Sequence, residues 1–262
     1  MENENNKLPV AQVPELLLIG DGRLARHLTT YFEQLGLGHA VWSRRGHAEG
    51  RSPELRALIH SGTRALLAIS DGAIEPFVSS HPELQDAIRI HFSGPLLTPL
   101  ATCAHPLFSF ASALYTRDLY ERIPFVIDKG APPLESLIPG LPNPAFFIDP
   151  ERRPRYHALC VLAGNFTTLL WRKFFYELDS EFGIAPEQAL PYLESVTRAL
   201  ARPGAPLSGP LSRGDHATIQ RNLEALQGDP FDDVYRAFLA AYERQERLSQ
   251  QTGKSWLLPS ER

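Results

Sequence analysis

The chain has 262 residues, of which 43% are hydrophobic and 21% charged, and its formal net charge is −4. This length and apolar content allow one large domain or two smaller ones. The slight acidic excess argues against nucleic acid as a partner, because phosphate backbones are bound by basic surfaces. No apolar run reaches the roughly 18 residues of a membrane span, so we expect no membrane segment.

Cysteine usage and the N-terminus bear on metal binding and on the compartment. Cys103 and Cys160 lie far apart and match no metal-ligand spacing, so we predict no metal site. A disulfide between them stays open, although two buried thiols in a reducing compartment fit better. The first ten residues are polar and acidic and lack a secretory pattern. We therefore expect a soluble, cytoplasmic protein with a short frayed start.

Short apolar runs alternate with helical patterns over residues 15–94. Four runs predict strands: ELLLIG, GHAVWSR, RALLAIS and AIRIHFSG. Between them we expect a helix over 23–36 that stops at Gly36, a short helix capped by Ser52 with Pro53 at its first position, and a helix that starts at Asp71. This alternation is typical of a mostly parallel sheet covered by helices.

The pattern changes in the second half of the chain. Residues 95–150 are rich in proline, and within them IPFVID and AFFID predict two more strands, with a short helix in PLESLIPGL. From residue 151 onward the patterns are helical, beginning with a long proline-free stretch over 156–183. We predict an α/β domain over 1–150 and a smaller all-α domain over 151–262, with a cleft between them.

A glycine-rich turn follows the first predicted strand. Residues 20–25, Gly20-Asp21-Gly22-Arg23-Leu24-Ala25, fit G-x-G-x-x-A, in which the first glycine allows the turn and the second admits a diphosphate. The helix that begins here offers free N–H groups to that diphosphate. We predict a dinucleotide site, and an ordinary strand–helix turn is the alternative. Asp21 would repel the diphosphate, and we expect Arg23 to offset it.

The end of the second predicted strand distinguishes NADP from NAD. Chains that bind NAD usually carry an acidic residue about 20 positions after the glycine motif, on the ribose hydroxyls. Here Ser43, Arg44 and Arg45 occupy that region, and the first acid is Glu49. Guanidinium groups bind phosphate oxygens in a bidentate fork, so we predict NADP, bound through its 2′-phosphate. A solvated basic loop is the alternative.

Several of these stretches together carry a family resemblance: IGDGRLA, WSRR, AISDGAI, HFSG, AHPLFSF, PFVID, YHALCVLAGNF and LSGPLSRGD. The chain resembles Rossmann-like NADP oxidoreductases with a C-terminal helical domain of unknown function. These are related to pyrroline-5-carboxylate reductase, ketopantoate reductase and 6-phosphogluconate dehydrogenase-like proteins. The resemblance implies a Rossmann-type domain that binds NADP and a helical domain that forms a homodimer.

The resemblance also implies positions along the cofactor. Ser70 and Asp71 would lie beside its ribose and nicotinamide half, although capping of the helix that follows is an equal alternative. His91 and Ser93 follow the next strand and should face the same crevice, because ligands of open parallel sheets lie beyond the carboxyl ends of the strands.

Candidate catalytic residues lie on the long helix. His157, Asn165, Thr168 and Arg172 fall within a sector of about 80° at regular helical periodicity, which suggests a polar stripe along a crevice. His157 is a candidate proton donor, and Thr168 a candidate substrate contact. By resemblance, Asn165 takes the place of a cleft-facing polar side chain. Exposure of His157 and a purely structural bond of Asn165 are the alternatives.

Two further stretches carry candidates. By resemblance, His105 in the His-Pro-Leu stretch lies near the cleft, and a buried structural turn is the alternative. Arg213, in SGPLSRGDHAT, could hold a substrate carboxylate, or it could pair with Asp215, which can cap the next helix.

Three functions follow from this pattern. The first is an NADP-dependent oxidoreductase of a small keto or imino compound, because hydride transfer needs little beyond placement of the nicotinamide and a proton donor. The second is a non-catalytic protein that binds or senses a dinucleotide. The third, a methyltransferase, would need an acid where Ser43 and Arg44 stand.

Overall fold

The computed structural model describes residues 15–202 and 207–253 of the chain. Residues 1–170 and 171–262 form two compact units, which we describe separately. The predicted frayed start lies outside the described residues.

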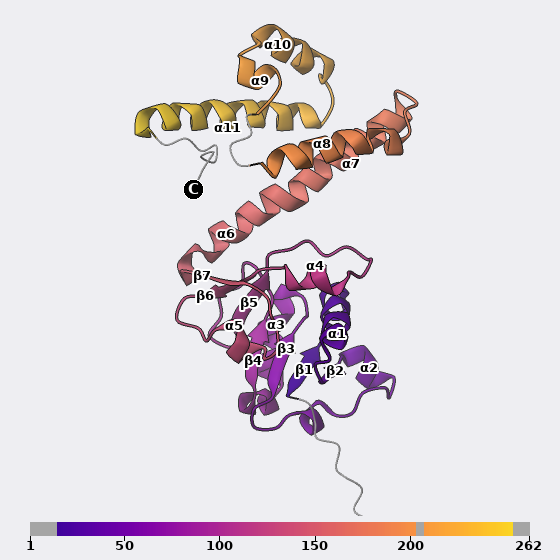
Figure 1. The fold of residues 1–262 in the computed structure, drawn as a ribbon, viewed down its shortest axis with the longest axis vertical. Helices are drawn as coiled ribbons and strands as arrows, with labels where there is room; N and C mark the ends of the chain where they lie inside the picture. Colours follow the sequence, from indigo (N-terminus) through magenta and orange to yellow (C-terminus); the bar gives the residue numbers. More distant parts are fainter. Residues whose placement is uncertain (1–14, 203–206, 254–262) are drawn as a thin grey trace, which may run out of the picture. The chain divides into compact units, whose positions relative to one another are not determined.

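The first unit contains a seven-stranded sheet in the order β2-β1-β3-β4-β5-β6-β7 (Figure 1). All neighbouring strands run parallel except β5 and β6, which are antiparallel. Its mostly parallel order confirms the α/β fold class. The strands are β1 (Leu16–Ile19), β2 (His39–Trp42), β3 (Arg64–Leu67), β4 (Ile88–His91), β5 (Thr102–Pro106), β6 (Phe125–Asp128) and β7 (Ala145–Ile148).

Helices cover both faces of this sheet, because successive side chains of β1 pack alternately into two apolar clusters, one on each face. Leu16 and Leu18 belong to one apolar cluster, whereas Leu17 and Ile19 belong to the other. The first cluster takes in α1 (Arg23–Leu35), α4 (Arg117–Glu121) and α5 (Leu134–Leu137); the second takes in α3 (Asp71–Ser80). Strands buried on both faces explain the continuous apolar runs in the sequence.

Several predicted boundaries hold, and one is wrong. Helix α1 ends at Gly36, whose φ of 71° is the left-handed conformation that glycine adopts without strain. The predicted cap at Ser52 is wrong, because only a short 3₁₀ helix, Leu55–Leu58, forms there and Glu54 precedes it. A second 3₁₀ helix, Pro82–Asp86, leads into β4.

The second predicted strand ends earlier than expected, at Trp42. Ser43 then caps the short helix α2 (Arg44–Ala48), and its side chain accepts a hydrogen bond from the backbone N–H of Gly46 at 3.0 Å. The chain therefore turns sharply at the carboxyl end of β2.

The long helix predicted after residue 151 is present. A 3₁₀ turn (Pro150–Arg152) leads into α6 (Arg153–Cys160), which continues through a π-helical stretch (Val161–Phe166) into α7 (Thr167–Ser180). The first turns of this helix pack on the sheet through Arg153, which is fully buried. The compact units divide between residues 170 and 171, within α7. The domain boundary expected near residue 150 stays a prediction.

The second unit is helical, as predicted. It comprises the end of α7, a 3₁₀ turn (Pro186–Ala189), α8 (Leu190–Leu200), α9 (Pro210–Arg213), α10 (His216–Ala225) and α11 (Phe231–Thr252). Lys173 binds both Glu177, at 2.7 Å, and Asp229, just before α11. Asp215 caps α10 by accepting the backbone N–H of Thr218 at 3.1 Å.

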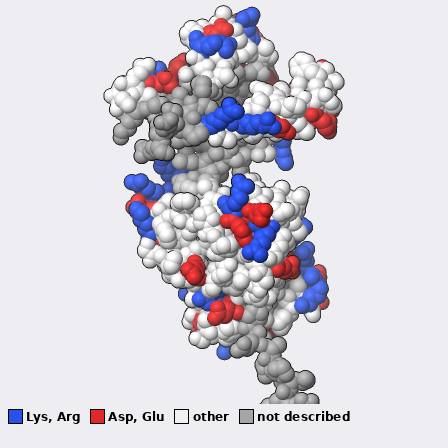
Figure 2. Space-filling model, viewed as in Figure 1, with Lys and Arg blue, Asp and Glu red and all other residues white. Residues whose placement is uncertain are grey.

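Two properties bear on partners. Within the described ranges, the helices are all too short or too polar to span a bilayer. On the face drawn in Figure 2, acidic and basic side chains lie beside one another in several places, with broad uncharged areas between them.

Candidate functional site

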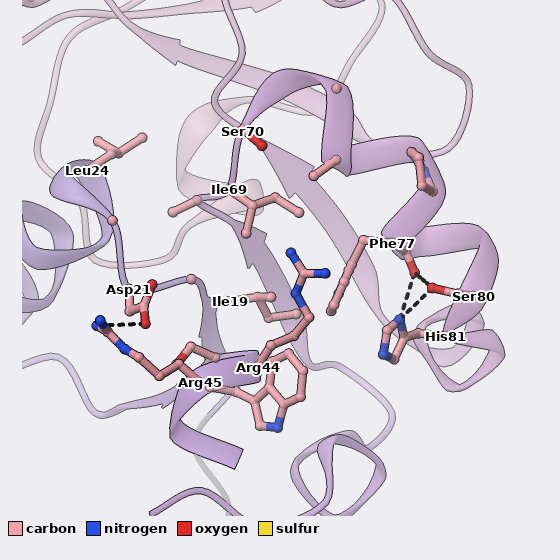
Figure 3. A pocket seen from close by; sticks show the side chains of 18 of the residues that line it. Ile19, Asp21, Leu24, Arg44, Arg45, Ile69, Ser70, Phe77, Ser80 and His81 are labelled. Atoms are coloured by element: carbon pink, nitrogen blue, oxygen red, sulfur yellow. Dashed lines mark hydrogen bonds and ion pairs between the residues drawn. The ribbon is translucent and has the colours of Figure 1, made fainter. Parts of the chain in front are cut away.

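A pocket of about 700 Å³ lies in the first unit, beyond the carboxyl ends of β1, β2 and β3 (Figure 3). The glycine-rich turn forms one wall, the Ser43–Arg45 turn another, and the start of α3 a third. Ligands of open parallel sheets bind at this edge. The residues that line it are Ile19, Gly20, Asp21, Gly22, Arg23, Leu24, Trp42, Ser43, Arg44, Arg45, Ala68, Ile69, Ser70, Gly72, Ala73, Pro76, Phe77, Ser80 and His81.

Gly20 and Gly22 are needed in the turn for different reasons. Gly20 has a φ of 134°, and a Cβ there would lie 2.3 Å from the carbonyl oxygen of Ala68, so only glycine fits between β1 and β3. A Cβ on Gly22 would meet no atom within 4 Å. Gly22 therefore leaves open space in the pocket wall where α1 begins, and α1 has no side-chain cap over its first N–H groups. This is the arrangement that a diphosphate needs.

Asp21 is neutralised, but by a residue other than the one expected. Its carboxylate lies 2.9 Å from the guanidinium of Arg45 (Figure 3). Arg23 instead donates a hydrogen bond to the backbone carbonyl of Phe110 at 3.2 Å. The expectation that Arg23 offsets Asp21 is therefore wrong, because Arg23 extends away toward the loop after β5.

Arg44 extends its side chain into the pocket between Ile69 and Phe77 (Figure 3). Among the described residues it has no hydrogen-bond or ion-pair partner. Ser43 lies beside it, and the Ser43 hydroxyl can still donate a hydrogen bond after accepting one from Gly46. An unpaired guanidinium and a hydroxyl at the end of β2 can together bind a phosphate.

Sequence analysis missed the far wall of this pocket. The His81 ring stacks on Phe77 with centroids 4.0 Å apart, and Trp42 packs against Phe77 at 5.8 Å. The Nδ1 atom of His81 is held 2.8 Å from the Phe77 carbonyl oxygen. The helix period of α3 places Phe77 and His81 on neighbouring turns, which is the signal that could have indicated this surface.

Other predicted cofactor residues lie at or beyond the margin of the pocket. Ser70 lines it, precedes α3 and makes no capping hydrogen bond there, whereas Ala25 and Asp71 stand outside its lining. His91 and Ser93 are buried: the Ser93 N–H donates to Nδ1 of His91 at 3.2 Å, and the Ser93 hydroxyl accepts from Leu96 N–H at 3.2 Å.

A second polar cluster lies further along the same sheet edge, within the first unit. His105, near the end of β5, and Tyr156, on α6, are joined between Nδ1 and the phenol oxygen at 2.9 Å. His157 lies next to them, with its ring centroid 6.1 Å from that of His105. The structure therefore brings two of the predicted catalytic residues together. It adds Tyr156, which is one position away in sequence and which sequence analysis missed.

A buried ion pair lies beside this cluster. Nε of the fully buried Arg153 lies 2.8 Å from the carboxylate of Asp128, and another Arg153 nitrogen lies 3.5 Å from the Gly94 carbonyl oxygen. Burial, followed by the charges of His157 and Arg153, lowers the pKa of His105 to about 4. Burial and Arg153 likewise lower the pKa of His91 to about 4. Both imidazoles are therefore neutral at pH 7.

The remaining candidates are exposed. Asn165 lies in the π-helical stretch, and Thr168 donates its hydroxyl to the Gly164 carbonyl at 2.9 Å. A π-helix turns by a smaller angle per residue than an α-helix, so the regular stripe predicted from His157 to Arg172 is interrupted. Arg213 is exposed at the end of α9 in the second unit. Over the described ranges, no three His, Cys, Asp or Glu side chains gather as a metal site.

Comparison with known families bears on the C-terminal part of the chain. Residues 125–242 match the model of a domain of unknown function, DUF2520. The match begins at β6 and extends into α11, so it takes in α6 and the helical unit. No curated protein matches the chain.

Solved structures share the fold over nearly the whole chain. A Bacteroides fragilis protein, provisionally described as an NADP oxidoreductase, is 20% identical with a TM-score of 0.68, and the match covers 87% of this chain and 97% of that one. Protein TM1727 of Thermotoga maritima is 23% identical with a TM-score of 0.65, over 91% and 100% of the two chains. The Aspergillus terreus reductive aminase, solved with NADPH and ethyl levulinate, is 15% identical with a TM-score of 0.59, over 90% and 95%.

These matches confirm the fold that the resemblance implies, a Rossmann-like sheet followed by helices, together with a match to a domain of unknown function over residues 125–242. The more specific reductase and dehydrogenase groups of that resemblance stay predictions.

Proposed function

We propose that the chain is an NADP-dependent oxidoreductase that acts on a small keto or imino compound. The observation that carries this proposal is the Arg44 guanidinium, which has no ion-pair or hydrogen-bond partner in residues 15–202 and 207–253 and shares one pocket with the open glycine turn of Gly22. Two of the proteins that share the fold were solved or described with NADP chemistry, and this agrees with the proposal.

The pocket residues would hold NADP in three places. The N–H groups at the start of α1, beside Gly22, would bind the diphosphate. Arg44 and Ser43 would bind the 2′-phosphate, and the surface of Trp42 and Phe77 would pack against the adenine. Bound NADPH would supply the hydride for the reaction.

Replacement of Arg44 tests the 2′-phosphate assignment. In Arg44→Ala the affinity for NADPH should fall by about 10- to 100-fold, because a charge-assisted phosphate contact is lost, whereas the affinity for NADH should change little. Titration calorimetry with both nucleotides measures this. Arg51→Ala is the control, because Arg51 is exposed, pairs with Glu49 and stands outside the pocket lining. Equal losses of affinity for NADPH and NADH would contradict the assignment of Arg44 to the 2′-phosphate.

A non-catalytic dinucleotide-binding protein is the alternative that shares this pocket. NADPH oxidation against a panel of aldehydes, ketones, keto acids and cyclic imines separates the two functions. Turnover with any member supports the oxidoreductase. Tight NADPH binding with no turnover across the panel supports the binding protein.

We further propose that the helical unit forms a homodimer in the cytoplasm. None of the described side chains in α8, α9, α10 and α11 is buried. Large apolar side chains there stay exposed, among them Tyr192, Leu200 and Phe238, the last at 56%. A helix with an uncovered apolar face is stabilised by burying that face, and a second copy offers a matching one. Both cysteines are free thiols, which agrees with a reducing compartment.

A further inference from the structure

Two imidazole rings converge on one glycine after β4. A Cβ at Gly94 would lie 2.2 Å from Cδ2 of His157, a distance that atoms do not adopt. The same point is 3.0 Å from Nε2 of His157 and 3.1 Å from Nε2 of His105. The two Nε2 atoms therefore face one small region of backbone, which stays accessible to them only because residue 94 has no side chain.

This region lies at the edge of the sheet that the proposed cofactor would follow. The glycine turn follows β1, Ser70 follows β3 and Gly94 follows β4, and these strands are successive neighbours. Neighbouring strands lie about 4.8 Å apart, so Gly94 is about 10 Å along the edge from the diphosphate turn. A dinucleotide whose 2′-phosphate lies at β2 and whose diphosphate lies at β1 would extend its nicotinamide half toward β4.

The groups packed around His105 carry little net charge. Arg153 and Asp128 neutralise one another, and His91 and His105 are uncharged at pH 7. Burial holds the pKa of the Tyr156 phenol above its ordinary value and that of the Cys103 thiol at about 12, so both stay protonated. A substrate carboxylate or a charged iminium would find no counter-charge here, whereas an uncharged carbonyl oxygen needs only hydrogen-bond donors.

We propose that His105, Tyr156 and His157 form the carbonyl-binding and proton-donating site of this enzyme, and that its substrate is an uncharged aldehyde or ketone. The inference rests on the proposed function, because it needs a nicotinamide beside the cluster.

Each residue has a defined task in this site. The Tyr156 hydroxyl donates to Nδ1 of His105, so that Nε2 of His105 carries the hydrogen and donates it to the carbonyl oxygen. Tyr156 is a positioning residue, because it acts through His105. As hydride reaches the carbonyl carbon and the C=O π bond breaks, Nε2 of His157 passes its hydrogen to the oxygen while Nδ1 takes a proton from solvent. The products are the alcohol, NADP⁺ and His157 in its other tautomer.

Nuclear magnetic resonance of the full chain, labelled with ¹⁵N and ¹³C in its nine histidines, tests this placement without a substrate. The probes are NADP⁺ and 2′,5′-ADP, which lacks the nicotinamide half. We expect both probes to shift the signals of His81, which lines the adenine end. Only NADP⁺ should shift His105 and His157, and neither should shift His39, which bonds the Leu37 carbonyl at the start of β2.

The outcomes separate this inference from the proposed function. If neither probe shifts His81 or binds by calorimetry, the proposed function fails. If both bind and NADP⁺ leaves His105 and His157 unchanged, the function stands and the placement of this site is wrong. Signals are assigned with His105→Gln, His157→Gln and His39→Gln.

The ¹⁵N shifts of His105 test the role of Tyr156. In the native protein they should show the hydrogen on Nε2, and in Tyr156→Phe they should show a mixture of tautomers, with NADPH affinity within twofold of native. Tyr192→Phe, an exposed change in the second unit, should leave the tautomer unchanged. A His105 tautomer that is insensitive to Tyr156→Phe would refute the positioning role.

Substrate class is tested by NADPH oxidation with cyclohexanone, butanal, pyruvate and 1-pyrroline. We expect turnover with the two uncharged carbonyl compounds and at least tenfold less with the other two. Tyr156→Phe should lower kcat more than it raises KM. Turnover confined to pyruvate or 1-pyrroline, or none with either uncharged carbonyl compound, contradicts the class.

Discussion

At the scale of single residues, two glycines of the first unit should respond in opposite ways to a methyl group. Gly94→Ala forces Cβ against the His157 ring, so the free energy of unfolding should fall by about 1–3 kcal/mol. Gly22→Ala meets no atom within 4 Å, so it should leave stability nearly unchanged while it weakens NADPH binding. Denaturant unfolding and calorimetry measure the two effects.

The double variant Gly94→Ala/His157→Ala gives the control for the first effect. Removal of the His157 ring should relieve the clash, so Gly94→Ala should lower the free energy of unfolding by less in the His157→Ala background than in the native protein. An undiminished cost would show that the clash lies elsewhere.

His91 and His105 make stability depend on pH. Each has a pKa of about 4 in the fold, against 6.5 for an unperturbed histidine, so the unfolded chain binds more protons between these values. Stability should therefore fall as the pH drops from about 6.5 toward 4, by about 2 kcal/mol per histidine between pH 7 and pH 5. Denaturant unfolding at several pH values measures the slope.

His91→Gln isolates one of these two contributions. The variant should lose about half of the slope in this pH range, whatever its absolute stability. A slope equal to that of the native protein would contradict the neutral, buried state of His91.

Sequence analysis identified site residues that are recognised by their type and their position in a motif. It missed pairings between residues that are far apart in sequence. Gly20, Gly22 and Arg44 follow from the order of strand, turn and helix. The pairing of Asp21 with Arg45, rather than with Arg23, depends on how the turns after β1 and β2 face one another. The approach of His157 to Gly94 joins positions 63 residues apart, and no local pattern indicates it.

At the scale of elements, strands with long apolar runs were predictable and β5 was not. β5 consists of Thr102–Pro106, and its mixed composition and terminal proline resemble a loop. It is a strand because β4 and β6 pair with it on either side. The π-helical stretch was also missed, because regular periodicity describes only an α-helix.

Gly164 lies in that π-helical stretch, and its substitution is testable. A Cβ there would meet no atom within 4 Å, so Gly164→Ala should raise the free energy of unfolding by about 0.5–1 kcal/mol through the lower entropy of the unfolded chain. Thermal unfolding monitored by circular dichroism measures this. A lowered melting temperature would show that the stretch needs glycine for its backbone.

At the scale of the whole molecule, the exposed apolar helices predict a dimer. Light scattering coupled to size-exclusion chromatography should give twice the chain mass of 29.2 kDa. Phe238→Glu/Leu248→Glu places charges at exposed apolar positions of α11, so it should shift the protein toward monomer. Gln220→Glu, an exposed polar change on α10, is the control. A native monomer at micromolar concentration would contradict the homodimer.

The fold class and six of the seven strands followed from the sequence, whereas the domain boundary near residue 150 stays a prediction. The composition changes near residue 150, yet α6 joins the sheet through Arg153 and Asp128, a pairing that only the folded chain shows.

A crystal structure with NADP⁺ tests the central claim most directly. We predict the diphosphate within hydrogen-bond distance of the main-chain N–H groups of residues 22–24, and the 2′-phosphate on Arg44. The claim would be contradicted by electron density for the nucleotide at another place. It would also be contradicted if a side chain closed the glycine turn and no nucleotide bound at saturating concentration.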